Sequence, residues 1–271
     1  PGDIQLGTTM DERKILIEAR DVCQDFPIKE GLLFPRQVGM LHAVNKVSLS
    51  VYEGETLALV GQSGAGKTTL GMMMLGLIEP TSGEIVFDGQ NIFNATKERR
   101  RKIIMETQLI FQDPLASLNP QIPVGKSIEL PLLNMGWEKP KREERVRELL
   151  DMVSLNPSHA SRYPHQFSGG QAQRIAIARA LAGSPKFIVL DEPVSALDVT
   201  IQAQIINLLK DLQAELRLTY LFITHNLAVV YYLSDRVAVM FQGRLVEIGD
   251  RDDVILNPQH EHTTELVASS T

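Results

Sequence analysis

The stretch TLALVGQSGAGKTTLGMMMLGLI, from Thr56 to Ile78, joins three local patterns that decide the fold. TLALV is a short apolar run, which is typical of a strand covered on both faces. GQSGAGKTT, from Gly61 to Thr69, matches G-x-x-x-x-G-K-S/T, a loop whose backbone N–H groups surround phosphate oxygens. KTTLGMMMLGLI then predicts a helix, whose N-terminus favours an anion. A strand, a glycine-rich loop and a helix in this order predict a nucleoside triphosphate site.

The residues of this loop have complementary expected roles. Its glycines let the backbone turn tightly. Lys67 would reach the β- and γ-phosphates, which makes it a catalytic as well as a binding candidate, and the Thr68 hydroxyl would bind Mg²⁺. The candidate nucleotide-binding residues are Gly61, Gln62, Ser63, Gly64, Ala65, Gly66, Lys67, Thr68 and Thr69.

FIVLDEP, from Phe187 to Pro193, supplies two adjacent carboxylates after an apolar strand. Asp191 at the strand end would lie beside Mg²⁺, directly or through a water molecule. Glu192 projects differently from Asp191, so it can take a proton from the attacking water. The pair therefore predicts a metal ligand and a general base for hydrolysis of the triphosphate.

The rest of the chain predicts an α/β fold. Buried strands alternate with helices, which implies a mostly parallel sheet with helices on both faces and antiparallel edge strands at each end. Residues 27–39 are rich in Pro and Gly and predict a loop. Between 113 and 182, frequent prolines break the chain into short pieces, which predicts a helical insert. Further strands are expected at 15–22, 41–55, 107–112 and 219–225, an amphipathic helix at 201–216, and a hairpin that turns at Gln242-Gly243.

The composition is typical of a soluble globular protein of 271 residues. Its formal net charge of −6 argues against a nucleic-acid binder, and the basic run Arg99 to Lys102 predicts a solvated helix face.

Cys23 is the single cysteine, which excludes an internal disulfide and a cysteine-rich metal site. The longest apolar run, Leu70 to Ile78, is far shorter than the ~18 residues of a membrane span. No basic-then-apolar signal segment opens the sequence, so we expect membrane association only through a partner.

FSGGQAQR, from Phe167 to Arg174, is a second candidate phosphate turn, because a hydroxyl and two glycines open a predicted helix. Gly169 and Gly170 would allow close backbone approach, with Arg174 as an anchor. An ordinary helix cap at Ser168 is the alternative. FSGGQ resembles LSGGQ, the signature of the nucleotide-binding subunits of ABC transporters, with Phe167 in place of Leu. The resemblance extends from about Ile15 to His262.

The resemblance implies roles for further residues and identifies the nucleotide as ATP. Gln112, in LIFQDP, matches a glutamine that contacts Mg²⁺ or water and faces the transmembrane partner. His225, in ITHN, matches a histidine that contacts the γ-phosphate and orients the water. Phe26 matches an aromatic residue that stacks on adenine, with a core or loop aromatic as the alternative. The implied catalytic residues are Lys67, Gln112, Glu192 and His225, and the implied Mg²⁺ ligands are Thr68, Gln112 and Asp191.

In the family that the chain resembles, two subunits pair head to tail. The turn of one subunit closes over the γ-phosphate bound to the other, and the segment matching Ser195 to Asp198 crosses between them. Binding of ATP therefore closes the dimer and hydrolysis releases it, as a ligand with different affinities for two states would. The residues implied to contact the other subunit's nucleotide are Ser168, Gly169, Gly170, Gln171 and Asp198.

The implied fold is α/β: a P-loop NTPase core with a mostly parallel sheet, an antiparallel β subdomain and a helical signature subdomain. We expect one ABC ATPase domain over 1–271. Its core and β subdomain are expected at 12–112 and 183–250, its helical subdomain at 113–182, and its C-terminal tail at 251–271.

Three stretches narrow the resemblance: the long loop between the first two strands, FQDPLASLNP, and LNPQHEHTTELVAS. They resemble the ATPase subunits of dipeptide and oligopeptide importers, a group that includes nickel and glutathione importers. FSGGQ followed by AQRI resembles the second of their two ATPase subunits. The implied partners are a second ATPase subunit in a hetero- or homodimer, two transmembrane permease subunits and an extracytoplasmic solute-binding protein, at the cytoplasmic face of the inner membrane.

Other functions stay open. A soluble ABC-type ATPase of DNA repair or translation would typically carry a coiled-coil insertion or two tandem cores, and the sequence has neither. A regulatory module without turnover would not need Glu192. No cysteine lies beyond Cys23, so an iron–sulfur centre near the C-terminus is excluded by ligand count. His260 and His262 are expected to be surface residues rather than metal ligands.

Overall fold

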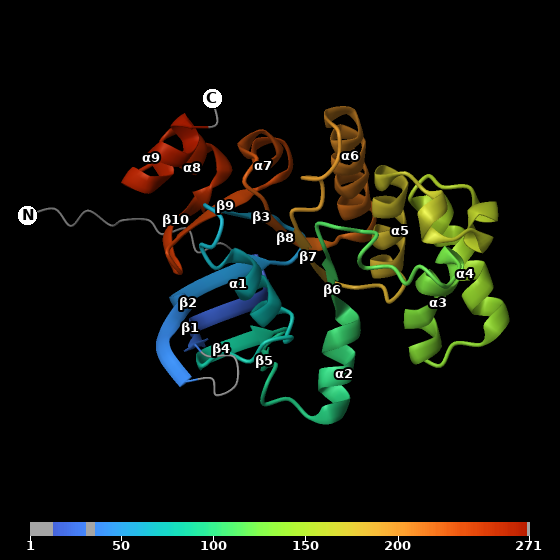
Figure 1. Cartoon of the computed structure of the whole chain (residues 1–271), viewed down its shortest axis with the longest axis horizontal. Helices are drawn as coiled ribbons and strands as arrows, with labels where there is room; N and C mark the ends of the chain where they lie inside the picture. The colour runs from blue at the N-terminus through green and yellow to red at the C-terminus, as the bar shows by residue number, and fades with distance from the viewer. Residues whose placement is uncertain (1–12, 31–35, 270–271) are drawn as a thin grey trace, which may run out of the picture.

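The computed structural model describes residues 13–30 and 36–269, and its strands form two sheets (Figure 1). The larger sheet contains β3 (Thr56–Val60), β6 (Thr107–Ile110), β7 (Phe187–Asp191), β8 (Thr219–Ile223), β9 (Arg236–Phe241) and β10 (Arg244–Asp250). Their order is β10-β9-β3-β8-β7-β6. All neighbours are parallel except β9 and β10, which form the predicted hairpin. The phosphate loop therefore leaves the sheet from a central strand.

The smaller sheet is antiparallel and consists of β1 (Ile15–Glu30), β2 (Arg36–Tyr52), β4 (Ser82–Phe87) and β5 (Gln90–Asn91). The prediction that the main sheet has antiparallel edge strands at both ends is wrong in part. The N-terminal strands form this separate sheet, and β6, one edge of the larger sheet, is parallel to its neighbour. The antiparallel β unit itself is present, as the fold class requires.

The predicted loop over 27–39 is also wrong in part, because β1 continues to Glu30 and β2 begins at Arg36. Pro27 pairs with Met40 and Ile28 pairs with Gly39. Pairing with a neighbouring strand outweighs the local turn signal of Pro and Gly, since strand formation depends on context more than on intrinsic preference. The remainder of the predicted loop, 31–35, lies outside the described residues.

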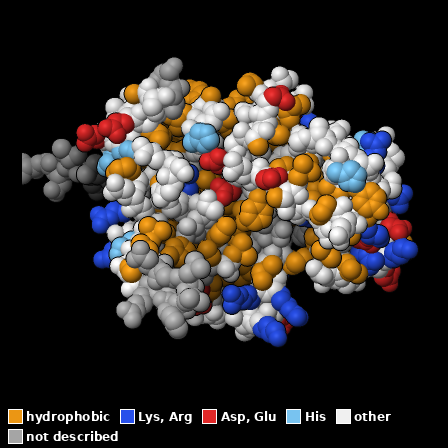
Figure 2. Space-filling model, in the orientation of Figure 1, with side chains coloured by type: hydrophobic (Ala, Val, Ile, Leu, Met, Phe, Trp, Pro, Cys, Tyr) orange, Lys and Arg blue, Asp and Glu red, His pale blue; other side chains and the backbone are white. Residues whose placement is uncertain are grey.

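Helix α1 (Lys67–Met74) follows the phosphate loop and lies between the two sheets (Figure 1). Its Leu70, Met73 and Met74 are fully buried in a core that contains apolar side chains of both sheets. Helix α2 (Lys97–Glu106) carries the basic run, and Figure 2 shows Lys and Arg side chains gathered over it, as predicted for a solvated face. The phosphate loop is thus anchored at one end by a strand and at the other by a buried helix.

The segment between 113 and 182 is helical, as predicted. It contains α3 (Val124–Asn134), α4 (Lys139–Met152), the 3-10 turns η1 (Pro157–Ser161) and η2 (Pro164–Gln166), and α5 (Gly169–Leu181). α5 packs against α3, α4 and α6 (Val199–Leu216). One core joins these helices to β7 and β8, so the helical part is packed directly on the parallel sheet.

The C-terminal helices α7 (Leu227–Leu233), α8 (Arg251–Leu256) and α9 (Glu261–Ala268) cover β3 and β9 from the side opposite α1. The surface position expected for His262 is wrong: its side chain is buried and its ring lies 4.0 Å from that of Phe241. Within residues 13–30 and 36–269, no group of three or more His, Cys, Asp and Glu side chains is placed to hold a metal ion. The same residues contain no helix with the length and apolarity that crossing a membrane would require.

We expect Leu209→Ala to lower the free energy of unfolding by about 2–5 kcal/mol, because Leu209 is buried where α6 packs on the sheet. Urea denaturation measures this loss. Leu216→Ala, at the half-exposed end of the same helix, is the control and should cost less than about 1 kcal/mol. Equal losses for the two variants would contradict the position of Leu209 in this core.

Candidate nucleotide-binding site

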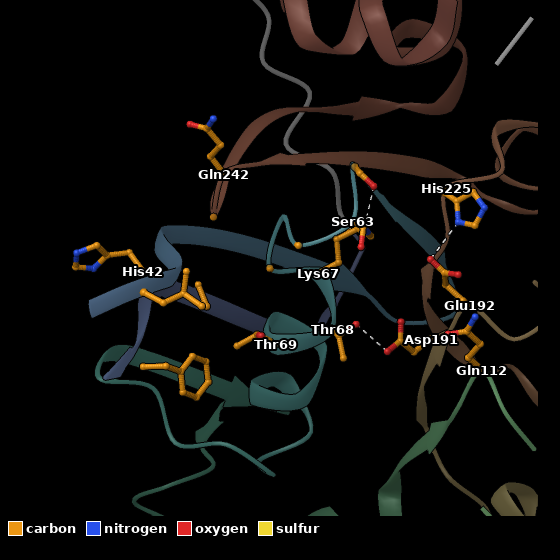
Figure 3. A pocket seen from close by; sticks show the side chains of 17 residues that line it. His42, Ser63, Lys67, Thr68, Thr69, Gln112, Asp191, Glu192, His225 and Gln242 are labelled. Carbon is orange, nitrogen blue, oxygen red and sulfur yellow. Dashed lines mark hydrogen bonds and ion pairs between the residues drawn. The ribbon is translucent and has the colours of Figure 1, made fainter. Parts of the chain in front are cut away.

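One cavity of about 990 Å³ lies at the carboxyl ends of the parallel strands, around the phosphate loop (Figure 3). This is where open α/β sheets bind ligands. Gln62 is exposed outside the cavity, and Ala65 is buried behind the loop. The predicted site residues that line the cavity are Phe26, Gly61, Ser63, Gly64, Gly66, Lys67, Thr68, Thr69, Gln112, Asp191, Glu192 and His225.

Two glycines fix the shape of the phosphate loop because neighbouring strands leave no room for a side chain. Gly61 has a φ of 149°, and a Cβ atom there would lie 2.2 Å from the Met240 carbonyl oxygen in β9. Gly66 has a φ of 98°, and its Cβ atom would lie 2.2 Å from the Ala43 carbonyl oxygen in β2. Both backbone conformations are accessible to glycine at little cost. The loop is therefore held between β9 and β2 before α1 begins.

Lys67 keeps its ammonium group over the loop. Its Nζ donates hydrogen bonds to the carbonyl oxygens of Gly61, at 2.8 Å, and Gln62, at 2.9 Å. Burial lowers the pKa of Lys67, and the nearby carboxylates of Glu192 and Asp191 oppose this effect. Phosphate oxygens would be stronger acceptors than these neutral carbonyls, because both partners of the hydrogen bond would then be charged.

Thr68, Asp191 and Gln112 place three side chains with oxygen atoms in the cavity. Thr68 Oγ1 donates a hydrogen bond to Asp191 Oδ2 at 2.8 Å. Burial raises the pKa of Asp191, which the hydrogen bond from Thr68 partly offsets. Hydroxyl, carboxylate and amide oxygens are hard ligands, and Mg²⁺ commonly takes one or two carboxylates together with substrate phosphates. The side chains present therefore fit Mg²⁺.

Glu192 turns away from Asp191 and faces His225 (Figure 3). Its φ of 48° is uncommon outside glycine, and its N–H donates to the Ile223 carbonyl oxygen at 2.9 Å. Glu192 Oε1 lies 3.1 Å from His225 Nδ1. Two consecutive carboxylates thus contact different partners, Thr68 and His225.

Phe26 lines the cavity from β1 and is 37% exposed. It pairs with Leu41 of β2, and His42 Nδ1 lies 2.7 Å from Asp25 Oδ1 beside it. This exposure does not fit a core aromatic, and it leaves the ring available for a stacked base.

The cavity is also lined by residues that sequence reasoning missed, from β2 and from the β9–β10 turn: Leu41, His42, Ala43, Gln242 and Gly243. Gly243 N donates to the Ala65 carbonyl oxygen at 3.1 Å, and its own carbonyl accepts from Asn45 N at 2.7 Å. The turn therefore braces the phosphate loop against β2. Its Gln-Gly sequence predicted a hairpin, but its place beside the loop follows from the pairing of β9 with β3, which no local pattern indicates.

A second group of predicted residues lies outside the cavity, at the N-termini of α5 and α6: Ser168, Gly169, Gly170, Gln171 and Asp198. Ser168 caps α5, because its Oγ accepts from Gln171 N at 3.4 Å while Gln171 Oε1 accepts from Ser168 N at 3.1 Å. Asp198 caps α6 through Ile201 N at 3.0 Å. A Cβ atom on Gly170 would lie 2.4 Å from Ile201 Cγ2, so the two helix ends are in close contact. Arg174 anchors the turn as predicted, by donating to the Val153 carbonyl oxygen at 2.8 Å.

The chain is similar to known proteins in sequence and in structure. A family model described as ABC transporter matches residues 44–195, which include the phosphate loop, the FSGGQ turn and both carboxylates. The chain belongs to the ABC transporter family. The oligopeptide transport ATP-binding protein AppF of Bacillus subtilis is 50% identical over 264 residues, which cover 96% of this chain and 80% of AppF.

Other members of the ABC transporter family differ in length or in sequence. The glutathione import ATP-binding protein GsiA of Pectobacterium atrosepticum is 50% identical over 255 residues, which cover 94% of this chain and 41% of GsiA. The ATP-binding cassette MJ0796, solved as a dimer in a post-hydrolysis state bound to ADP and Pi, is 29% identical with a TM-score of 0.76. That match covers 87% of this chain and 99% of MJ0796. CbiO1 of Clostridium perfringens is 27% identical with a TM-score of 0.76, over 90% of this chain and 92% of CbiO1.

We expect Lys67→Ala to weaken Mg·ATP binding by about a hundredfold or more, because it removes the ammonium group held over the phosphate loop. Equilibrium binding of a fluorescent ATP analogue to the purified chain measures this. Lys102→Ala, on the exposed face of α2, is the control and should bind as the wild type does. Tight Mg·ATP binding by the Lys67 variant would contradict the assignment of the phosphate loop.

Proposed function

We propose that this chain is the ATP-hydrolysing subunit of an ABC importer, in which ATP-driven closure of an ATPase dimer powers the uptake of a small solute. The cavity carries this proposal, because it brings the phosphate loop together with Gln112, Asp191, Glu192 and His225. A triphosphate clamp, a set of metal ligands and a candidate general base within one cavity meet the requirements of hydrolysis. The post-hydrolysis ADP and Pi complex of MJ0796 supports the same chemistry in the family.

In the proposed reaction Glu192 is the general base, and its carboxylate takes a proton from the attacking water. His225 orients that carboxylate through its 3.1 Å contact with Oε1. Lys67 offsets the negative charge that develops on the γ-phosphate. When bound, Mg²⁺ neutralises charge on the phosphate oxygens, with Thr68, Asp191 and Gln112 as its proposed ligands.

We further propose that the site is completed by a second ATPase subunit. Ser168 and Asp198 lie at helix ends outside the cavity of their own chain. The first N–H groups of α5 lack partners within the helix, so they are suited to an anion from another chain. In this proposal the core at 12–112 and 183–250 holds ATP, and the helical subdomain at 113–182 presents Ser168 to the nucleotide of the partner.

The names of the relatives suggest the solute and the other partners. AppF is an oligopeptide transport protein and GsiA a glutathione import protein, and both are 50% identical to this chain. We therefore propose uptake of oligopeptides or of a related small peptide such as glutathione. The proposed complex contains two permease subunits and an extracytoplasmic solute-binding protein, with this chain bound at the cytoplasmic face of the membrane and Gln112 facing the permease.

We expect Glu192→Gln to retain Mg·ATP affinity while ATP turnover falls by about a hundredfold or more, because the variant lacks the general base. Phosphate release by the full chain, assembled with its partner subunits, measures turnover. Glu143→Gln, on the exposed face of α4, is the matched control and should hydrolyse normally. Unchanged turnover in the Glu192 variant would remove its assignment as general base.

We expect the turn at Ser168 to reach a second subunit only when ATP is bound. A Cys23→Ser, Ser168→Cys chain, labelled on its one thiol with a photoreactive group, should crosslink to the phosphate loop of another ATPase subunit. Trapping ATP with Glu192→Gln should raise the yield of this product, which has the summed mass of two subunits. Crosslinks confined to one chain, or equal yields without ATP, would contradict the head-to-tail arrangement.

A further inference from the structure

Helix α5 links two parts of the protein that the proposed function uses separately. Its first turn carries Ser168 as the cap, and its last turn carries Arg179. About 11 residues of helix, or roughly 16 Å, separate them. Most side chains between these ends are buried, including Ile175, Ala176 and Ile177. A helix packed in this way moves as a rigid unit, so a displacement at one end is a displacement at the other.

Arg179 holds the segment that follows Gln112. Its Nη1 donates to the Ser117 carbonyl oxygen at 2.5 Å, and its Nη2 donates to Ser117 Oγ at 3.1 Å. The guanidinium group is partly buried, and among the described residues it forms no ion pair with a carboxylate. Two donors on one residue form a geometrically specific contact, which a single point charge does not reproduce.

The segment from Gln112 to Leu118 is compact, and both of its ends are fixed. Asp113 Oδ1 accepts from the backbone N–H groups of Leu115 and Ala116 at 3.0 and 3.1 Å. Ser117 Oγ donates to the Pro114 carbonyl oxygen at 2.8 Å, so one hydroxyl joins the turn to Arg179. Gln112 itself is exposed. Its position therefore depends on β6 before it and on the Ser117 contact after it.

The same segment forms a wall beside the nucleotide site. A cavity of about 410 Å³ next to the main one is lined by Gln112, Ser117, Thr68 and Asp191 among others. Gln112 lines both cavities. A shift of Ser117 would therefore move Gln112 relative to the other two proposed Mg²⁺ ligands, Thr68 and Asp191.

We propose that Arg179 is a positioning residue that ties Gln112 in one nucleotide site to the Ser168 turn, which serves the other site. This inference rests on the proposed function, since it takes the roles of Gln112 and Ser168 from it. When ATP bound to the partner subunit contacts the Ser168 turn, the turn and α5 shift together. Arg179 and Ser117 move with α5, and their movement sets the position of Gln112. Each site thereby responds to occupation of the other through a physical contact.

The test is a double-mutant cycle on the full chain assembled with its partner subunits. The variants are Arg179→Ala, Gln112→Ala and the double variant. The rate is divided by the amount of Mg·ATP bound, so that unfolded protein does not lower the measured kcat.

We expect each single change to lower kcat about tenfold and to leave KM within about twofold of the wild type, because a small misplacement at a site lowers the rate rather than the affinity. The double variant should be no slower than Gln112→Ala alone, because Arg179 acts through Gln112. Arg179→Lys, which lacks the fork but can reach one acceptor, should recover part of the loss.

Arg147→Ala is the control, because Arg147 lies on the exposed face of α4, away from both sites, and also donates to a backbone carbonyl oxygen, that of Glu143. Its kcat should stay within about twofold of the wild type, and any loss should multiply with that of Gln112→Ala. Multiplying effects of Arg179→Ala and Gln112→Ala would overturn the inference and leave the ATPase assignment intact. A normal kcat for Gln112→Ala would overturn both this inference and the proposed catalytic role of Gln112. Unchanged turnover in Glu192→Gln would instead remove the general base of the proposed reaction, and it would not bear on the contact between Arg179 and Ser117.

Discussion

Two close contacts between backbone segments determine the shape of the phosphate loop, and the loop in turn determines the position of the site. Gly61 passes the Met240 carbonyl oxygen and Gly66 passes that of Ala43 at distances that exclude any side chain. These contacts bring together β9 of the parallel sheet and β2 of the antiparallel sheet around one loop. The phosphate loop is therefore a junction between two sheets as well as a turn between a strand and a helix. This explains why its shape depends on residues almost 180 positions further along the chain.

The parallel sheet determines which side chains surround this junction. Asp191 ends β7, Thr224 and His225 follow β8, and Gln112 lies just beyond β6. Strands that run in one direction deliver all these residues to one edge, although they are distant in sequence. The electrostatics follow from this crowding: burial lowers the pKa of Lys67 and raises that of Asp191, while the opposite charges counter both shifts. The site therefore brings a lysine and two carboxyl groups close together, as a polyphosphate and a divalent cation require.

Local patterns predicted the parts of the site that are contiguous in sequence. The phosphate loop, the strand that ends in Asp191 and the cap at Ser168 each show a recognisable order of residue types within about ten positions. His42, Gln242 and Gly243 were missed because they reach the cavity only through strand pairing. The same cause explains the error at Pro27 and Gly39, where a paired strand replaced a predicted loop. The position of His262 was predicted wrongly because α9 packs this residue against Phe241 at the end of β9.

The helix caps at Ser168 and Asp198 leave backbone donors that the single chain does not use. The side chains of Ser168 and Asp198 already accept backbone N–H groups within their own chain, at 3.4 and 3.0 Å. These bonds satisfy part of each helix end without any nucleotide or partner chain. Other N–H groups of the first turns remain without intrahelical partners, and the Ser168 hydroxyl still has its proton to donate. The unused donors are accessible at an exposed turn, where they add little to the stability of the single chain. Their interaction energy becomes available when an anion is brought to them, which is the condition for a nucleotide to favour the closed dimer over the separate subunits.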